Sequence, residues 1–234
     1  MQLFYDKSCT FEMLKMNQTL KIKNMKKIYF IIAAAVSMFF AAETYAQIGV
    51  GVGYNMLNNV QKALDEDASS SLNGFYLEAT YDINFLDKSW GELGIQPGVR
   101  FTYAGTQESE ELLGVVTKAS ERETYLDIPV LVKYSYDLNI LKLSAFAGPV
   151  VSCGVSSVAK VSAGDNVVKG NNYDENSAYG RFDIKFGLGL GATFMDKFNA
   201  KIGYNLGMLN RYTGNIDEVA LRTGVMYIGV GINF

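Results

Sequence analysis

Acidic clusters are the groups of residues in this sequence that most readily suggest chemistry. Three glutamates fall within residues 108–111, and three further carboxylates fall within residues 165–175. Carboxylate oxygens suit Ca²⁺, but solvated polar loops have the same composition, and we expect loops here. The repeat GVGVG (residues 49–53) lacks the lysine of a phosphate-binding loop and the full dinucleotide-binding fingerprint, so it favours a strand face of small residues.

Charge and composition exclude several function classes. The sequence contains no histidine, the side chain that most often transfers protons near neutral pH. Six of the 21 Lys and Arg and three of the 24 Asp and Glu lie in residues 1–46, which leaves residues 47–234 with a net charge of −6. Such a chain lacks the basic field of a nucleic-acid-binding protein. Cys153 is alone in residues 47–234, so no intrachain disulfide is expected there.

The N-terminal region has the pattern of an export signal. Met25-Lys26-Lys27 precedes fifteen uncharged residues (28–42), and small residues follow up to Ala46. A basic segment, an apolar segment and a small-residue site predict a signal peptide over residues 25–46, cleaved after Ala46. Fifteen residues fall short of the roughly 20 that a membrane-spanning helix needs. Residues 1–24 are interpreted as an upstream mis-start or a disordered extension.

The rest of the chain alternates apolar and polar residues with a period of two. In YLDIPVLVKY (residues 125–134), Leu126 and Val130 fall on one face, and Asp127 and Lys133 fall on the other. This period predicts β-strands with two unlike faces. Eight such segments occur, at residues 47–57, 74–85, 91–104, 123–136, 141–155, 179–194, 199–208 and 220–234.

The connections between these segments alternate between short and long. Short turns follow the second, fourth and sixth segments, and long polar segments follow the first, third, fifth and seventh. Outer-membrane barrels have short periplasmic turns and longer extracellular loops. The predicted turns are residues 86–90, 137–140 and 195–198, and the predicted loops are residues 58–73, 105–122, 156–178 and 209–219.

The distribution of charge between the faces indicates which face points outward. The apolar faces carry aromatic residues near the segment ends and no charge except Arg222, whereas the polar faces are rich in glycine. A lumen of eight strands is only wide enough to be filled by side chains, and charges there need partners of opposite sign. We therefore predict an all-β, eight-stranded antiparallel up-and-down transmembrane β-barrel over residues 47–234, with a lipid-facing exterior and a polar, filled lumen. The predicted lumen charge network is Glu78, Asp82, Glu92, Arg100, Glu123, Asp127, Lys133, Lys142, Arg181, Asp183, Lys185 and Lys201.

Two features resemble known outer-membrane barrels. Phe234, preceded at two-residue steps by Ile232 and Val230, resembles the terminal strand signal that the barrel-assembly machinery recognises. YLDIPVLVKY and AFAGPVVS (residues 145–152) resemble signatures of the PorT-like outer-membrane β-barrel family, which is common in Bacteroidota. The resemblance covers essentially residues 47–234 and implies both termini on the periplasmic side. The namesake of that family is associated with secretion and gliding.

These observations predict an integral barrel of the bacterial outer membrane without enzymatic activity. Known small outer-membrane enzymes resemble one another in relying on a histidine, and no catalytic residue, metal or cofactor is expected. The predicted role is structural, or binding of an extracellular or envelope partner through the loops, with outer-membrane lipid around the barrel and no nucleic acid. The alternatives are a narrow channel or secretion-associated component, and a soluble exported barrel that holds an apolar ligand.

Overall fold

The computed structural model describes residues 46–63, 66–112, 115–163, 166–174, 179–214 and 219–234 of the 234-residue chain. The chain divides into two units, residues 1–43 and 44–234, and every described strand belongs to the second. The predicted extension (1–24) and all of the predicted signal peptide except Ala46 lie outside the described residues, so both stay predictions. The described part of the chain has no helix that is long and apolar enough to cross a membrane.

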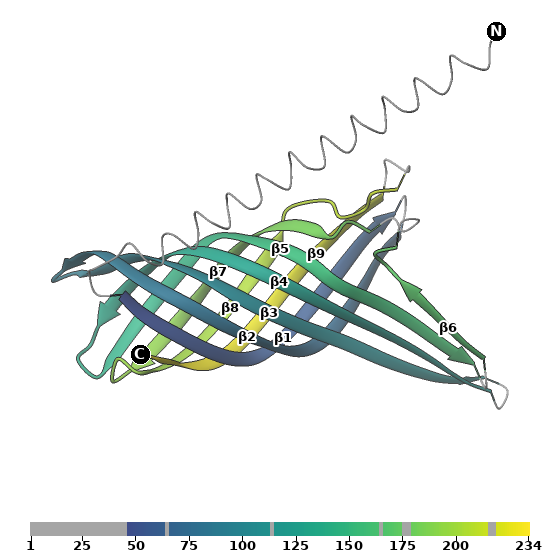
Figure 1. Cartoon of the computed structure of the whole chain (residues 1–234), viewed down its shortest axis with the longest axis horizontal. Helices are drawn as coiled ribbons and strands as arrows, with labels where there is room; N and C mark the ends of the chain where they lie inside the picture. Colours follow the sequence, from purple (N-terminus) through teal and green to yellow (C-terminus); the bar gives the residue numbers. More distant parts are fainter. Residues whose placement is uncertain (1–45, 64–65, 113–114, 164–165, 175–178, 215–218) are drawn as a thin grey trace, which may run out of the picture. The chain divides into compact units, whose positions relative to one another are not determined.

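Antiparallel strands form one sheet that closes on itself (Figure 1). Neighbours in the ring are β4-β3-β2-β1-β9-β8-β7-β5, and pairing of β5 with β4 completes it. β6 pairs with β5 outside the ring of eight strands. This confirms the predicted all-β antiparallel barrel. The strands are β1 (Ala46–Ala63), β2 (Glu66–Lys88), β3 (Gly91–Leu112), β4 (Val115–Asp137), β5 (Leu141–Ala163), β6 (Asn166–Asn171), β7 (Phe182–Phe194), β8 (Phe198–Gly207) and β9 (Val219–Asn233).

The apolar face points outward, as predicted from the alternation. Leu188 and Ile202 are exposed, whereas the neighbouring Asp183 and Lys185 are each 1% exposed. Tyr81 pairs with the exposed Ile48 and so lies on the same outward face, although its own side chain is only 9% exposed. A soluble barrel with an apolar interior would have the opposite arrangement. The exterior therefore has the character of a lipid-facing surface.

The apolar part of the exterior has the height of a membrane. On β3 the outward apolar residues run from Leu93 to Tyr103. Ten steps of about 3.3 Å along a strand tilted by roughly 40° rise about 25 Å, which is the height of the lipid-facing band of outer-membrane barrels. Aromatic rings lie at both edges of the apolar band. The ring centres of Phe75 and Tyr103 are 5.4 Å apart at one edge, and those of the stacked Trp90 and Tyr134 are 6.1 Å apart at the other.

The short turns and the connection predicted at residues 209–219, between β8 and β9, are confirmed, but the other three predicted long loops are corrected. Residues 58–73 and 105–122 were expected to be loops, yet β1–β2 and β3–β4 stay paired through most of these ranges. Residues 156–163 likewise extend β5, and β6 lies within the expected loop 156–178. The β3–β4 and β5–β6 hairpins extend together beyond the band (Figure 1). The outward faces of these strands are no longer apolar there, because side chains beyond the band do not contact lipid.

Pro129 of β4 and Pro149 of β5 lie beside a gap in the β4–β5 ladder. The β4–β5 pairing passes from Pro129↔Val150 to Val132↔Ala147 with no shift of register. Proline has no N–H to donate, which accounts for the missing pairs. The register shift in this ladder lies elsewhere, between Thr124 and Tyr125.

The depth of the apolar band predicts where a charge is harmful. We expect Leu188→Arg, at the middle of β7, to lower the free energy of unfolding by about 2–4 kcal/mol in lipid vesicles, because it places a cation at the bilayer centre. Ser71→Arg, an exposed outward residue of β2 beyond the band, should cost about 1 kcal/mol or less. Unfolding in urea measures both. Equal losses at the two positions would contradict this placement of the band.

Candidate functional site

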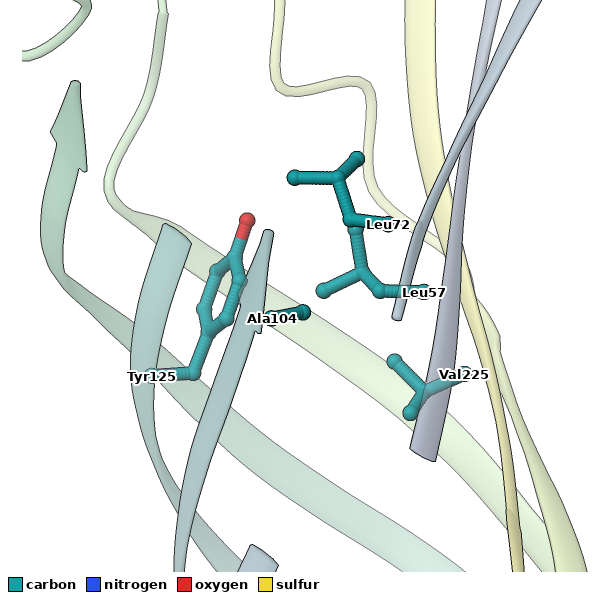
Figure 2. Packing of buried hydrophobic residues seen from close by; sticks show 5 residues of the cluster. All are labelled: Leu57, Leu72, Ala104, Tyr125 and Val225. Atoms are coloured by element: carbon teal, nitrogen blue, oxygen red, sulfur yellow. The ribbon is translucent and has the colours of Figure 1, made fainter. Parts of the chain in front are cut away.

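Side chains fill the interior of the barrel and divide it into layers. Tyr76, Leu131, Phe146, Val150 and Tyr227 form one buried cluster across the barrel, which we call the central plug. Nearer the hairpins, a second cluster unites five strands and includes Leu57, Leu72 and Tyr125 (Figure 2). The charged residues lie between and beyond these two clusters. The interior therefore contains alternating apolar and ionic layers rather than a continuous polar pore.

The central ionic group consists of Glu78, Arg100 and Lys201. Arg100 donates from Nη2 to Glu78 at 2.8 Å and from Nε to the same oxygen at 3.1 Å. Lys201 pairs with the other oxygen of Glu78. The Arg100 guanidinium lies over the rings of Tyr227, at 4.0 Å, and Tyr76, at 4.7 Å. Because all of these groups are removed from water, each charge depends on its partners.

Two further ion pairs lie toward the turn end of the barrel. Lys133 Nζ lies 2.9 Å from Asp82, which also accepts a hydrogen bond from Gln96. Lys142 Nζ lies 3.0 Å from Glu92. The second pair is about one-fifth exposed at each side chain. Water therefore reaches the mouth at this end.

The cavities become smaller from the turn end of the barrel toward the central plug. The mouth at the turn end holds a cavity of about 620 Å³, which Asp82, Glu92, Lys133 and Lys142 help to line. The adjoining space beside Phe146 measures only about 20 Å³, and a water molecule needs about 10–15 Å³. The open mouth therefore narrows to the size of a single water where it meets the central plug.

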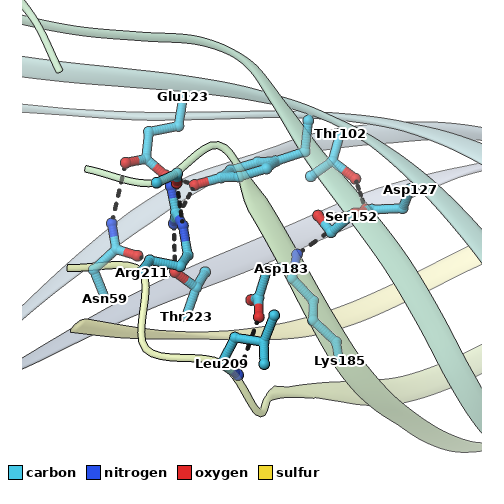
Figure 3. Close-up of polar contacts among 12 residues, drawn as sticks. Asn59, Thr102, Glu123, Asp127, Ser152, Asp183, Lys185, Leu209, Arg211 and Thr223 are labelled. Carbon is cyan, nitrogen blue, oxygen red and sulfur yellow. Dashed lines mark hydrogen bonds and ion pairs between the residues drawn. The ribbon is translucent and has the colours of Figure 1, made fainter. Parts of the chain in front are cut away.

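Asp127 and Lys185 form an ionic group on the hairpin side of the plug (Figure 3). Lys185 Nζ lies 3.5 Å from Asp127, which also accepts hydrogen bonds from Thr102 and Ser152. The ammonium group lies 4.8 Å from the centre of the Tyr125 ring. Both charged residues are 1% exposed. These contacts offset the desolvation of the two charges.

Arg211 closes the hairpin end of the interior, which the sequence analysis did not predict. Its guanidinium donates to the hydroxyl of Thr223 at 2.7 Å (Figure 3). It also donates to the hydroxyls of Tyr125 at 2.8 Å and Tyr173 at 2.9 Å. The Tyr125 hydroxyl in turn donates to Glu123. Arg211 is 1% exposed although it belongs to no strand. Burial raises the pKa of the Tyr173 hydroxyl, which therefore stays protonated at neutral pH.

Backbone bonds hold the Arg211 segment over the barrel end. The N–H of Gly180 donates to the carbonyl of Arg211 at 2.6 Å, and the N–H of Arg211 donates to the carbonyl of Leu221 at 2.8 Å. Arg211 Nε also reaches the carbonyl of Gly180 at 3.2 Å. We call Tyr125, Tyr173 and Arg211 the hairpin-end cap.

The structure brings nine of the twelve predicted lumen residues into four ion-paired groups, and the other three differ. Glu123 is buried but is held by Asn59, Ser157 and Tyr125 through hydrogen bonds. Asp183 accepts the backbone N–H of Leu209 at 3.4 Å. Arg181 lies outside the interior: it is exposed, and its guanidinium contacts the carbonyl and ring of Tyr173. The ion-paired residues are Glu78 with Arg100 and Lys201, Asp82 with Lys133, Glu92 with Lys142, and Asp127 with Lys185.

Arg211 takes the place that the sequence analysis assigned to Arg181. Exchanging the two residues leaves six basic and six acidic residues in the predicted set. β7 begins at Phe182, so Arg181 precedes the strand and its side chain is free to leave the barrel. No periodicity marks Arg211, because it lies in a polar connection. The one sequence signal that could have pointed to Arg211 is the need of the buried Glu123 for a nearby cation.

The remaining predictions concern the C-terminal Phe234 and the two acidic clusters. Phe234 is 75% exposed, and its N–H donates to the carbonyl of Ile48 at 2.8 Å. Within the described residues, no group of three or more His, Cys, Asp or Glu side chains could hold a metal ion. Asp165 and Glu175 lie outside the described residues, and the side chains of Glu110 and Glu111 are likewise not described.

Comparisons with known proteins point to one family. Residues 38–213 match the family described as outer membrane protein beta-barrel domain. No curated protein matches the chain. Among solved structures, Ail of Yersinia pestis is 16% identical, with a TM-score of 0.41, and the match covers 81% of this chain and 99% of Ail.

Other similar structures include enzymes. The outer membrane enzyme PagL is 12% identical with a TM-score of 0.42, and the match covers 80% of this chain and 98% of PagL. The outer membrane protease OmpT from Escherichia coli is 8% identical with a TM-score of 0.41, and the match covers 81% of this chain and 96% of OmpT. Such a likeness does not separate enzymes from other barrels.

The buried central ion pair predicts a large effect of removing one charge. Arg100→Met should lower the free energy of unfolding by about 3–5 kcal/mol, because Glu78 would keep only Lys201 and lose a buried partner. Lys142→Met at the wet mouth is the matched control and should cost less. Urea unfolding in lipid vesicles measures both variants. A loss at Arg100 no larger than that at Lys142 would refute the role of burial.

The hairpin-end cap predicts a local change in protection. Arg211→Gln should speed amide exchange at Gly180 and at residue 211 by about 10–100-fold, because a buried charged hydrogen bond contributes about 1.5–3 kcal/mol. Arg222→Gln removes an exposed arginine with no hydrogen bond or ion pair among the described residues and should leave this exchange unchanged. Hydrogen exchange read by mass spectrometry distinguishes them. Unchanged protection in Arg211→Gln would show that the cap is held by the backbone alone.

Proposed function

Because the chain belongs to the outer membrane protein beta-barrel domain family, we propose that it is a non-enzymatic integral barrel with a closed interior. In this proposal the barrel anchors its hairpins at the cell surface, where they provide a binding surface. The observation that carries the proposal is the central plug, in which Tyr76, Phe146 and Tyr227 cross the barrel around the Arg100 ion pair. A closed barrel leaves the hairpins as the part that can meet a partner.

The interior carboxylates support a structural rather than a catalytic role. Glu78, Asp82 and Asp127 each accept contacts from at least two side chains. A general acid or base must reach a proton of the substrate, and these groups are occupied by partners inside the barrel. Asp82 borders the mouth cavity of about 620 Å³, but the space between this mouth and the central plug is only about 20 Å³.

Export and assembly follow from the same proposal. The signal peptide of residues 25–46 would direct export and be removed after Ala46. The barrel-assembly machinery would recognise the C-terminal strand β9 together with the exposed Phe234 that follows it. Short turns would face the periplasm and the long hairpins would face outward.

The mouth cavity favours one alternative. A cavity of about 620 Å³ at the turn end is the entrance that a narrow channel or a secretion-associated component would need. The resemblance of YLDIPVLVKY to PorT-like barrels agrees with the second of these roles. Either role requires the central plug to move, because Tyr76 and Tyr227 lie against Arg100.

Electrical recording separates the closed barrel from the channel. We expect the purified chain in planar bilayers to pass no steady current above leak, because the central plug blocks the ion path. Tyr76→Ala/Tyr227→Ala, which removes two rings of the plug, should increase the current and serves as the positive control. Steady conductance in the unaltered protein, at the level of this variant, would overturn the closed interior.

A further inference from the structure

Four basic residues gather on the outward face of the extended hairpins. Lys118 and Arg122 come from β4, Lys160 from β5 and Lys169 from β6, and they line a cavity of about 280 Å³. No carboxylate lines this cavity; its other residues are Gln107, Ser120, Val158 and Ser162. We call it the basic pocket. Lysine, arginine and serine side chains are donors that suit phosphate oxygens.

The strand register places like charges opposite each other in the basic pocket. Lys160 pairs directly with Lys169 in the β5–β6 ladder, and Ser120 pairs with Lys160 on the other side. Like charges directly opposite on a sheet face are destabilising. None of the four basic side chains forms an ion pair or hydrogen bond within the described part of the chain. Among the described side chains, none therefore supplies a counter-charge to the basic pocket.

Three acidic residues of the same hairpin, Glu108, Glu121 and Glu123, lie on the opposite face, whereas Glu111 shares the outward face at the hairpin tip. By strand alternation Glu121 and Glu123 point away from the face that carries Arg122. Glu123 is indeed buried in the barrel interior, whereas Arg122 is exposed. Glu108 likewise alternates with Gln107, which lines the basic pocket. The outward face around Arg122 and Lys160 is therefore basic and open to an external anion.

The height of the basic pocket points to the headgroup region of a large lipid. On β4 the outward apolar residues end at Leu126, and Ser120, which pairs with Lys160, lies six residues farther, about 15 Å along the barrel axis at a tilt of roughly 40°. The polar layer of an ordinary bilayer is only about 5–8 Å on each side. A phosphorylated glycolipid has a taller headgroup than a phospholipid. Its phosphates are the anions that reach this level beside the barrel wall.

We propose that the basic pocket binds the phosphorylated headgroup of a glycolipid in the outer leaflet. The outward face carries the pocket directly above the apolar band, so a lipid standing against the barrel can place its phosphate between Lys160 and Lys169. Ser120 and Ser162 supply neutral donors on either side. Binding neutralises the opposed lysines and connects the β5–β6 hairpin to the membrane surface.

This inference deepens the proposed function, on whose membrane orientation it rests, because it names a ligand class for the hairpin surface. It does not depend on the closed interior. A conducting barrel would overturn the central plug and leave the basic pocket in place, whereas loss of lipid binding would leave the conductance result unchanged. The two failures are therefore distinguishable.

The test measures lipid retention by the full chain in phosphatidylcholine nanodiscs. The discs contain either diphosphorylated lipid A or the same lipid without its phosphates, and native mass spectrometry counts the lipid A bound to the protein. Lys160→Gln/Lys169→Gln should weaken binding of the phosphorylated lipid roughly 30-fold, about fivefold for each charge removed. Lys88→Gln/Lys197→Gln removes two exposed lysines at the turn end and should change binding less than about twofold.

Each outcome decides the proposal. Preference for the phosphorylated lipid, lost in the Lys160→Gln/Lys169→Gln variant and kept in the control, supports it. Equal retention of both lipids, an unchanged double variant, or an equal loss in the control overturns it. A further arm adds soluble dextran sulfate: if this polyanion binds through Lys160 and Lys169 while lipid A shows no preference, the lipid assignment is wrong. Removing two opposed like charges should not prevent folding, which heat-dependent migration on gels verifies.

Discussion

The structure depends on the need to pair every backbone N–H and C=O that lies in lipid. Hydrocarbon offers no hydrogen bonds, so a strand that crosses it must be paired on both edges. Pairing of β4 with β5 satisfies this need by closing the ring. Once the ring is closed, alternation forces every second side chain into a narrow lumen. The apolar exterior and the crowded ionic interior are both consequences of that closure.

In the crowded interior, charged side chains form ion pairs and lie against aromatic rings. Arg100 lies between Glu78 and two tyrosine rings, and Lys185 lies between Asp127 and the ring of Tyr125. The two ends of the barrel differ. The turn end keeps a wet mouth around Glu92 and Lys142, whereas Arg211 seals the hairpin end. An asymmetric interior of this kind suits a membrane anchor whose contacts are made by the hairpins.

The hairpins show what the same strands do beyond lipid. β3 and β4 continue past the apolar band without a break in pairing, and β4 and β5 stay paired beyond one register shift at Thr124/Tyr125, while their outward face becomes polar and basic. Leu126 ends the apolar run on β4, and Arg122 begins the basic one. One continuous strand thus presents an apolar outward face within the band and a basic outward face beyond it. The same strands stay paired in both parts.

The sequence by itself determined the strand faces, the number of strands in the ring and the short turns. These follow from a period of two, because one face meets lipid and the other does not. The strand ends in residues 58–73, 105–122 and 156–171 could not be read from it, since side chains outside lipid lose the alternation while the backbone stays paired.

Only the tertiary structure decided which charges meet. Lys201 reaches Glu78, and Arg211 reaches Tyr125, from strands and segments far apart in the chain. Arg181 and Arg211 have the same side chain, yet one is exposed and the other is buried. Ring closure and the path of the connecting segments set these partners, and neither is encoded in the local pattern.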